Sequence, residues 1–389
     1  MSIRVGVIFG GKTVEHEVSI ISAVQAMKSL NSDKYIAVPI YISKNKEMYT
    51  GKLLKEIESY KDINKLIKHS KNVTLYNEKG RYFIQTKGIF KKIIEEVDIV
   101  LPIVHGNNVE DGTIQGFLET IGVPYVGSGV IASAMGQDKV FMKQIFSAND
   151  ISIVDYTWFY DFEYKENKDK IINEILKLNF PVIVKPATLG SSVGIAKADN
   201  MKELIDAINE AIKYDNKIVV EKVIQDLTEV NCSVLGTYED QKVSEIEEVM
   251  STDEFLTYKD KYLGSGGKSK GMASTNRIIP ARIDNKTRKE VKHIARKVFK
   301  VLNLAGVCRI DFLIDKKENK VYINEPNTIP GSLSYYLWEP IGKKYDMLLD
   351  EMISIAIRSY KKKQNTIYSF DTNILENFNG LKGNKGKLR

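Results

Sequence analysis

With 389 residues, the chain is long enough for two or three domains and a sizeable core. Its hydrophobic and charged fractions, 43% and 28%, are those of a folded globular protein and exclude a chain that is disordered throughout. The net charge of +7 comes mostly from lysines spread along the sequence, so it favours anionic small substrates over nucleic acid.

Nothing in the sequence indicates export or membrane insertion. Its apolar runs stay below the roughly 18 residues that span a bilayer, and the N-terminus begins with a strand pattern instead of a signal peptide. Cys232 and Cys308 lie in apolar runs and match no metal-binding spacing, so we interpret them as buried thiols. These features predict a cytoplasmic protein in a reducing compartment.

The first segment alternates strands and helices in the order of an open α/β sheet. Residues 5–9 form a short apolar run typical of a buried parallel strand, and a turn follows at Gly10 and Gly11. Apolar residues then recur at helical spacing, residues 36–42 predict the next strand, and residues 113–121 predict another helix. This order indicates a doubly wound first domain.

The same region contains a misleading motif. Gly6, Gly11, Lys12 and Thr13 match the phosphate-loop pattern G-x-x-x-x-G-K-[ST]. The residues between the two glycines belong to the strand over 5–9, so they cannot form a loop of free N–H groups. We therefore reject a phosphate loop.

Two polar stretches of this first segment are candidate ligand sites. Glu15 lies near the start of the predicted helix and could hold a substrate ammonium or cap the helix. Residues 97–104 predict a buried strand that ends at His105, and the polar loop 107–112 follows at its carboxyl end, where open α/β sheets bind ligands. For His105 we favour a positioning or packing role over that of a catalytic base.

The middle segment combines lysines with a Gly/Ser loop in a way that suits phosphates. Lys139 and Lys143 lie one turn apart on a predicted helix. Lys185 lies near the end of the apolar strand predicted over 180–186. The loop 188–194 follows, and its backbone N–H and hydroxyl groups could cover phosphates.

Two more strands are predicted over 217–223 and 229–236, and the connection between them could receive an adenine ring. A loop rich in glycine and serine follows over 264–275. We interpret it as a lid that brings Lys261 and Tyr262 over a reaction centre and excludes water. The neutral alternative is a disordered insertion.

A hairpin over 307–327 carries the strongest candidate site. Arg309 and Asp311 share one face of its first strand, and Glu325 and Asn327 share one face of its second. Two carboxylates and an amide oxygen suit a hard cation such as Mg²⁺, and the permanent charge of Arg309 suits an anion beside it. The alternative is the solvated face of an edge hairpin.

The hairpin is bounded by helices and by a sharp break. An amphipathic helix is predicted over 284–302 before it, and a last helix over 346–360 after it. Pro330 and Gly331 end the second strand just past the acidic pair, where a backbone N–H could face a reacting centre.

Over residues 3–350 the chain resembles the D-alanine–D-alanine ligases of the ATP-grasp superfamily. Seven motifs in the same order are highly specific for that family. They are F-G-G-K-T-V-E-H-E-V-S (9–19), H-G-N-N-V-E-D-G-T-I-Q-G (105–116), P-Y-V-G-S-G-V (124–130), V-K-P-A-T-L-G-S-S-V-G (184–194), Y-K-D-K-Y (258–262), R-I-D-F (309–312) and N-E-P-N-T-I-P-G (324–331).

The resemblance implies ATP as co-substrate, together with two Mg²⁺ ions for which Mn²⁺ could substitute. The implied nucleotide site consists of Lys139 and Lys185 on the α- and β-phosphates, Ser191 and Ser192 in the loop over the phosphates, Glu221, Lys222 and Ile224 around adenine, Glu229 at the ribose and Lys261 on the γ-phosphate. The implied metal ligands are Asp311, Glu325 and Asn327.

The resemblance also implies where the amino acids bind. The ammonium of the first would meet Glu15 in a hydrogen-bonded set with Ser191 and Tyr262, and Arg309 and the N–H of Gly331 would stabilise a tetrahedral oxyanion. His105, Ser332 and Tyr336 would line the substrate site. The implied product is a dipeptide for peptidoglycan precursor synthesis.

The expected architecture is an α/β multidomain protein with an ATP-grasp fold and an N-terminal Rossmann-like open sheet. We expect an N-terminal domain over 1–130, a central ATP-grasp subdomain over 131–224, a C-terminal catalytic subdomain over 225–362 and a polar basic tail over 363–389. We also expect a homodimer with small-molecule substrates and no nucleic acid.

One departure from the family leaves the second amino acid open. Residues 332–339 read S-L-S-Y-Y-L-W-E, and Tyr336 falls about where the family has a serine that grips the second substrate's carboxylate. A ligase for a different amino acid pair is therefore one alternative, although Tyr262 resembles the version that accepts an amine. A catalytically silent nucleotide-binding protein is another, against which the intact Asp311, Glu325 and Asn327 argue.

Overall fold

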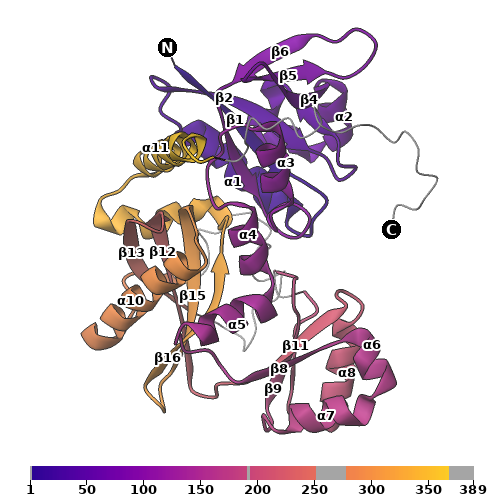
Figure 1. The fold of residues 1–389 in the computed structure, drawn as a ribbon, viewed down its shortest axis with the longest axis vertical. Helices are drawn as coiled ribbons and strands as arrows, with labels where there is room; N and C mark the ends of the chain where they lie inside the picture. Colours follow the sequence, from indigo (N-terminus) through magenta and orange to yellow (C-terminus); the bar gives the residue numbers. More distant parts are fainter. Residues whose placement is uncertain (1, 191–192, 251–276, 368–389) are drawn as a thin grey trace, which may run out of the picture.

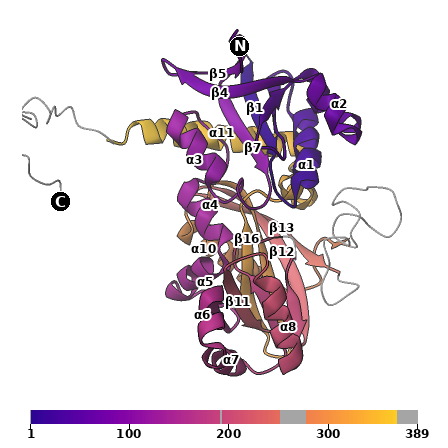
Figure 2. The same ribbon diagram turned by 90° about the vertical axis from the view of Figure 1, so that its right-hand side faces the viewer.

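The computed structural model describes residues 2–190, 193–250 and 277–367, which form three sheets stacked along the long axis of the molecule (Figures 1 and 2). A seven-stranded sheet comes from the N-terminal third, a four-stranded sheet from the middle and a five-stranded sheet from the C-terminal part. No helix among these residues is both long enough and apolar enough to cross a membrane.

The N-terminal sheet has a parallel half and an antiparallel half. Its strand order is β6-β5-β4-β3-β2-β1-β7, with β1 parallel to both β2 and β7. The strands are β1 (Ile3–Gly10), β2 (Tyr35–Ile42), β3 (Met48–Thr50), β4 (Lys71–Glu78), β5 (Arg81–Thr86), β6 (Ile93–Val97) and β7 (Ile99–Val104). Its helices are α1 (His16–Ser29), α2 (Ile63–Lys68) and α3 (Thr113–Ile121), with short 3-10 turns η1 (Lys52–Lys55) and η2 (Ile57–Lys61).

The predicted open α/β sheet is confirmed, and so is the rejection of a phosphate loop, because Gly6 lies inside β1. The turn falls at Gly10 and Gly11, whose φ angles of 92° and 104° suit glycine. The buried strand predicted over 97–104 is confirmed as β7, which starts at Ile99 instead of Val97. The chain bends at Asp98, whose carboxylate accepts a hydrogen bond from the N–H of Arg4 at 2.7 Å, so Val97 ends an antiparallel strand.

The central sheet has the antiparallel order β10-β9-β11-β8. Its strands are β8 (Tyr156–Tyr160), β9 (Val182–Pro186), β10 (Ala196–Ala198) and β11 (Lys217–Lys222), and the helices α6 (Asp161–Glu166), α7 (Lys168–Leu176) and α8 (Met201–Ala211) pack against it. The helices α4 (Val130–Gln137) and α5 (Lys139–Ala148) connect it to the first domain (Figure 1). The predicted hairpin around the Gly/Ser loop is present as β9 and β10.

The C-terminal sheet is antiparallel throughout, in the order β14-β13-β12-β15-β16. Its strands are β12 (Leu227–Gly236), β13 (Gln241–Val249), β14 (Arg277–Ile278), β15 (Gly306–Asp315) and β16 (Lys320–Asn327), and α10 (Asn285–Val301) covers one face. The buried face of β15 carries Ile310, Phe312 and Ile314. Cys232 and Cys308 are free, buried thiols in this core, as predicted, and burial raises the pKa of both.

The chain returns to the first domain at its C-terminal end. After η4 (Gly331–Leu337) and η5 (Glu339–Ile341), the helix α11 (Tyr345–Gln364) buries Leu348, Leu349 and Ile353 in the core of the N-terminal sheet. The apolar face of α11 therefore joins the two ends of the sequence into one packed unit (Figure 2).

Candidate active site

The exposed face of the β15–β16 hairpin brings four of the predicted site residues together. Asp311 lies directly opposite Glu325, and Arg309 lies opposite Asn327. The Arg309 guanidinium donates two hydrogen bonds to the carboxylate of Asp311, at 2.7 and 2.8 Å, and the Asn327 amide donates a third at 3.1 Å. The predicted alternation of the strand therefore places its polar side away from α10.

Strands β12 and β13 extend this polar floor with residues that the sequence did not single out. Asn231 lies opposite Asp311 on one side and opposite Glu247 on the other, and Ser233 lies opposite Arg309. Directly opposed residues of antiparallel strands point to the same face of a sheet. The polar alternation in the motif E-V-N-C-S-V could have revealed Asn231, but nothing in the sequence indicated the pairing with Glu247.

The donor set of the hairpin fits a hard divalent cation. Two carboxylates and an amide oxygen lie on adjacent strands, and oxygen ligands of this kind suit Mg²⁺, which usually keeps water and substrate phosphate in its remaining positions. In the described part of the chain, no three His, Cys, Asp or Glu side chains gather around a metal position.

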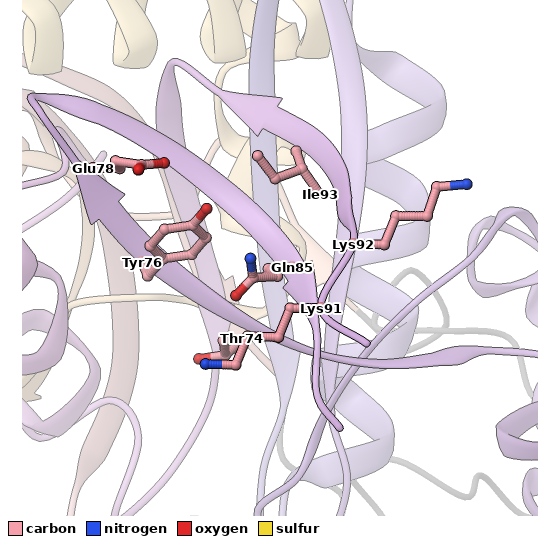
Figure 3. A pocket seen from close by; sticks show the side chains of 7 residues that line it. All are labelled: Thr74, Tyr76, Glu78, Gln85, Lys91, Lys92 and Ile93. Atoms are coloured by element: carbon pink, nitrogen blue, oxygen red, sulfur yellow. The ribbon is translucent and has the colours of Figure 1, made fainter. Parts of the chain in front are cut away.

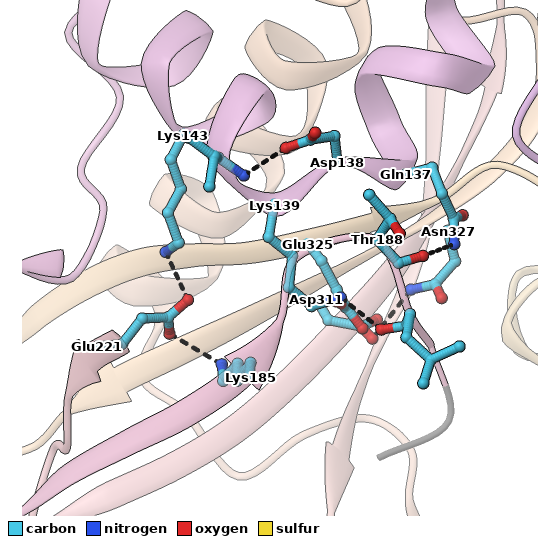
Figure 4. A network of polar contacts seen from close by, with 12 residues as sticks. Gln137, Asp138, Lys139, Lys143, Lys185, Thr188, Glu221, Asp311, Glu325 and Asn327 are labelled. Atoms are coloured by element: carbon cyan, nitrogen blue, oxygen red, sulfur yellow. Dashed lines mark hydrogen bonds and ion pairs between the residues drawn. The ribbon is translucent and has the colours of Figure 1, made fainter. Parts of the chain in front are cut away.

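A row of lysines and carboxylates connects this hairpin to the central sheet (Figure 4). The Lys139 ammonium lies 3.5 Å from the Glu325 carboxylate and donates a hydrogen bond to the carbonyl of Leu189 at 2.9 Å. Lys185 donates to Glu221 at 2.8 Å. The row thus places the two predicted phosphate-binding lysines between an acid on the β15–β16 hairpin and an acid on β11.

Glu221 is held by two ammonium groups rather than one. Lys143 lies 3.1 Å from its other carboxylate oxygen and is 1% exposed along its side chain. Burial alone would raise the pKa of Glu221, but Lys143 and Lys185 lower it to about 2. Burial lowers the pKa of Lys143, whereas the pKa of Lys185 is raised because Glu221 outweighs its burial. The sequence placed Lys143 one turn from Lys139 but gave it no role.

Helix α5, which carries Lys139 and Lys143, begins at a buried ion pair. One oxygen of Asp138 accepts hydrogen bonds from the N–H groups of Val140 and Phe141, and the other accepts one from Lys217 at 2.8 Å. The Lys217 ammonium also lies 3.6 Å from the centre of the Phe141 ring. An aspartate cap fixes the start of a helix, so this pair fixes the direction of Lys139.

A cavity of about 430 Å³ surrounds Glu15 at the junction of the N-terminal and central sheets. Its lining consists of Lys12, Thr13, Val14, Glu15, Lys44, Gly106, Asn107, Asn108, Leu189, Gly190 and Tyr214. A second cavity, of about 760 Å³, lies on the outer strands β4, β5 and β6 and contains none of the predicted site residues (Figure 3). The cavity beside Glu15 is therefore the candidate subsite for a small substrate.

We expect Gly106→Ala to weaken binding of the first amino acid. A Cβ atom at Gly106 would lie 3.2 Å from a carboxylate oxygen of Glu15 and 3.3 Å from Cβ of Thr13, and φ there is +88°. Glu15 is the expected partner of the substrate ammonium. Displacing it should raise the KM for that substrate about tenfold, because weakening a hydrogen bond between charged groups costs about 1.5 kcal/mol. Gly80→Ala is the matched control, since its φ is +78° and nothing lies within 4 Å. Equal effects of both substitutions would contradict the expectation.

Helix α1 connects the predicted residues His105 and Ser332. His105 is buried and its Nε2 lies 3.3 Å from the Ser22 hydroxyl, which accepts a hydrogen bond from the N–H of Ser332 at 2.9 Å. The Ser332 hydroxyl donates to Gln25 at 2.7 Å. Burial lowers the pKa of His105, which fits the expected positioning role better than that of a charged acid.

The turn that follows Gly331 has an unusual backbone. Ser332, Leu333 and Ser334 have φ values of 50°, 52° and 50°, a left-handed conformation that costs non-glycine residues about 1–2 kcal/mol each. The hydrogen bonds to α1 and the burial of Leu333 and Leu337 in the N-terminal core hold this turn. It directs the chain so that Tyr336 returns to the floor of the site, where its hydroxyl donates to Glu247 at 3.3 Å.

Glu110, in the loop after β7, is a candidate residue that the sequence did not identify. One of its carboxylate oxygens accepts from the N–H of Gly106 at 2.9 Å, and the other accepts from the N–H of Ile329 at 3.0 Å. It therefore ties the His105 loop to the segment that follows Asn327. Burial, reinforced by the charge of Glu15, raises the pKa of Glu110 to about 8.

This raised pKa predicts a pH-dependent contribution to stability. Between its ordinary value of 4.5 and about 8, the folded protein holds a proton on Glu110 that the unfolded chain releases. The free energy of unfolding should therefore fall with rising pH across that window, by up to about 1.4 kcal/mol per pH unit from this group. Urea denaturation of Glu110→Gln should show its deficit relative to wild type shrinking from pH 5.5 to pH 7.5. A deficit independent of pH would show that Glu110 titrates normally.

The remaining predicted site residues divide between described and undescribed parts of the chain. Lys222 ends β11 with its side chain exposed, Ile224 is half-buried beyond it, and Glu229 lies on β12 opposite Leu313. Ser191, Ser192, Lys261 and Tyr262 lie outside the described residues, as does the predicted lid over 264–275.

An open α/β sheet, followed by two antiparallel sheets with lysines and carboxylates between them, is the architecture of ATP-dependent ligases of the ATP-grasp class. A family model described as D-ala D-ala ligase N-terminus matches residues 4–128, and one described as D-ala D-ala ligase C-terminus matches residues 145–354. The chain therefore belongs to the D-alanine–D-alanine ligase family. The fold class and the family resemblance seen in the sequence are both confirmed.

Individual relatives agree with this assignment over nearly the whole chain. A D-alanine–D-alanine ligase of Thermosipho africanus is 43% identical, over 96% of this chain and 98% of its own. Among solved structures, the D-alanine–D-alanine ligase of Coxiella burnetii superposes with a TM-score of 0.78 at 26% identity, covering 93% of this chain and 96% of its own. The VanG D-Ala:D-Ser ligase of Enterococcus faecalis gives 0.77 at 30% identity, covering 92% and 100%.

Proposed function

We propose that the enzyme joins two molecules of D-alanine, using ATP, into D-alanyl-D-alanine for peptidoglycan precursor synthesis. The observation that carries the proposal is the row from Glu221 through Lys185 and Lys139 to Glu325. Ammonium groups held between carboxylates in this way suit the anionic phosphates of a nucleotide. Glu325 at one end of the row lies opposite Asp311, which Arg309 contacts, and the guanidinium of Arg309 offers the positive charge that transfer of a phosphoryl group needs.

In the first step, a carboxylate oxygen of the first D-alanine attacks the γ-phosphorus of ATP, and ADP leaves. In our proposal Glu15 holds the ammonium of that amino acid, which leaves its carboxylate free to react. Lys139 and Lys185 hold the α- and β-phosphates, and the permanent charge of Arg309 offsets charge on the transferred group. The product is an acyl phosphate.

In the second step, the neutral amine of the second amino acid attacks the acyl carbon and forms the C–N bond. The C–O bond to phosphate then breaks, and the departing inorganic phosphate takes up the proton that the amine loses. The N–H of Gly331, at the start of η4, and Arg309 are the proposed donors to the oxyanion. Because an acyl phosphate hydrolyses in water, exclusion of solvent from the site is part of this proposal.

Asp311, Glu325 and Asn327 are the residues that we propose for two Mg²⁺ ions, which Mn²⁺ could replace. Bound there, the ions would neutralise phosphate charge and orient the γ-phosphoryl group. In the structure described here the carboxylate of Asp311 accepts hydrogen bonds from Arg309 and Asn327, so Arg309 would gain freedom to approach phosphate when a cation takes over Asp311.

The deciding experiment is phosphate release from ATP and Mg²⁺ with D-alanine, measured against a panel of D- and L-amino acids. D-alanine-dependent release, with the dipeptide found by mass spectrometry, is the expected result. Turnover only with another pair would replace this proposal by that of a ligase with a different acceptor, which the tyrosine at position 336 favours. Silence on every pair would indicate a nucleotide-binding protein without ligase activity.

We also propose the wider context of the enzyme. Domain boundaries near residues 130 and 224 fall between successive sheets, and the third, near 362, falls close to the end of α11, with a basic tail beyond. A cytoplasmic location suits an enzyme that uses ATP and has free thiols. Assembly as a homodimer is a proposal that light scattering can test.

A further inference from the structure

Three side chains form a charged cluster at the edge of the polar floor, between β13, β14 and η4. Nε of Arg277 lies 3.1 Å from one carboxylate oxygen of Glu247, and the Tyr336 hydroxyl lies 3.3 Å from the other. The Arg277 guanidinium also lies 4.0 Å from the centre of the Tyr336 ring. Each member thus contacts both of the others.

The cluster is shielded from solvent, which makes these contacts strong. The side chains of Glu247 and Arg277 are 3% and 14% exposed. A guanidinium that is paired through one edge and stacked on an aromatic ring is fixed in orientation, and few other side chains can be held this way. Burial, together with the charge of Glu247, raises the pKa of Tyr336 to about 12, so its hydroxyl keeps its proton and remains a donor to Glu247.

The position of the cluster relates it to the reaction centre. Glu247 lies opposite Asn231, which lies opposite Asp311, so two strand spacings, or roughly 10 Å, separate the backbones at Glu247 and Asp311. Tyr336 follows the proposed oxyanion donor Gly331 in the same 3-10 turn. The charges of Arg309 and Asp311 act on Tyr336, as those of Arg277 and Glu247 do, so the cluster adjoins the proposed oxyanion site.

We propose that Arg277 binds the carboxylate of the second, amine-donating amino acid. The inference rests on the proposed function. A buried carboxylate needs a cationic donor, and Arg309 is assigned to the phosphoryl group. The Tyr336 hydroxyl already donates to Glu247, whereas a guanidinium has five N–H donors in a fork and can hold a substrate carboxylate as well as Glu247. Glu247 and Tyr336 act as positioning residues that orient Arg277.

The test offers D-alanine amide in competition with D-alanine and compares the two products, the dipeptide and the dipeptide amide, which mass spectrometry separates. The amide has no carboxylate, so it can accept the acyl group but cannot be activated. Wild type should prefer the acid over the amide, and Arg277→Gln should lose about tenfold to a hundredfold in kcat/KM for the acid with little change for the amide. Arg277→Lys, which keeps the charge without the fork, should recover part of the loss.

Arg282→Gln is the matched control. Arg282 lies a few residues further along the chain, pairs with Glu248 at 2.7 Å and is 60% exposed along its side chain, so its removal should leave the preference for the acid unchanged. Equal losses with acid and amide in Arg277→Gln, or the same change of preference in Arg282→Gln, would overturn the assignment.

Hydroxylamine separates this inference from the proposed function. Its nitrogen attacks the acyl phosphate, phosphate leaves, and a hydroxamate forms without any amino acid in the second subsite. Arg277→Gln should therefore keep wild-type hydroxamate formation from D-alanine, which also shows that the variant is folded. A parallel loss of hydroxamate would make Arg277 a general structural residue and overturn the proposal.

The comparison runs with whichever acceptor the amino acid panel selects, paired with its own amide. If D-alanine is not a substrate but another amino acid is, the proposed function is overturned. The role of Arg277 is then still decided by whether the enzyme prefers that amino acid over its amide. Failure of every pair would overturn both.

Discussion

Asp311→Asn is expected to reduce ATP-dependent peptide formation by about a thousandfold, the scale of losing one electrostatic group in a preorganised site. The substitution keeps the size of the side chain but removes one of the two carboxylates that face each other across β15 and β16. It also leaves Arg309 without the anion that holds it at 2.7 and 2.8 Å. The substitution should therefore weaken binding of the proposed cation and also free the guanidinium of Arg309 to change its orientation.

The readouts of Asp311→Asn separate catalysis from folding. Phosphate release should become insensitive to Mg²⁺ concentration. The loss of thermal stability should stay below that of Glu221→Gln, because the side chains of Arg309 and Asp311 are 17% and 21% exposed. Asp315→Asn, on the same face of the same strand, is the control, because the carboxylate of Asp315 accepts hydrogen bonds from the N–H groups of Lys317 and Glu318 in the turn, away from Arg309. Near-normal turnover in Asp311→Asn would show that the metal assignment is wrong.

Glu221→Gln is expected to lower the free energy of unfolding by about 3–5 kcal/mol, the usual result of leaving buried charge unpaired. The carboxylate lies between Lys143 at 3.1 Å and Lys185 at 2.8 Å, and all three side chains are nearly inaccessible to water. A glutamine cannot neutralise the ammonium groups of Lys143 and Lys185. Each lysine must therefore lose its proton or become exposed to water. Urea denaturation at neutral pH measures the loss.

Lys143→Met provides the comparison for this prediction. It removes one ammonium but leaves the pair of Glu221 and Lys185 intact, so its cost should be smaller than that of Glu221→Gln. The double variant should be more stable than Glu221→Gln alone, because one uncompensated charge replaces two. If the double variant is less stable than both Glu221→Gln and Lys143→Met, the charge of Glu221 is not what balances the two ammonium groups.

Nucleotide binding adds a second readout to the same series. If phosphates bind at Lys185, saturating ATP should stabilise Glu221→Gln more than it stabilises wild type, since the nucleotide would replace the missing negative charge. Equal stabilisation of both proteins would place the phosphates elsewhere.

Local sequence patterns predicted much of the fold because they report on the nearest neighbours of each residue. The apolar run over 5–9 and the helical spacing after it predicted the open sheet, since only a buried parallel strand and an amphipathic helix satisfy them. The strand predicted over 97–104 started two residues too early, because Asp98 separates two strands that pair in different directions. Periodicity carries no information about such pairing.

The sequence by itself determined the polar face of the β15–β16 hairpin, the lysines at 139 and 185 and the membership of the family, because strand alternation and motif order are local properties of the chain. Only the tertiary structure decided how Glu221 shares two lysines, how Glu110 reaches Ile329 and how Arg277, Glu247 and Tyr336 meet. The members of each set come from distant parts of the sequence, and their partners are fixed by sheet register and by the left-handed turn after Gly331. Burial in the folded chain is also what shifts their pKa values, and burial cannot be read from the spacing of residues.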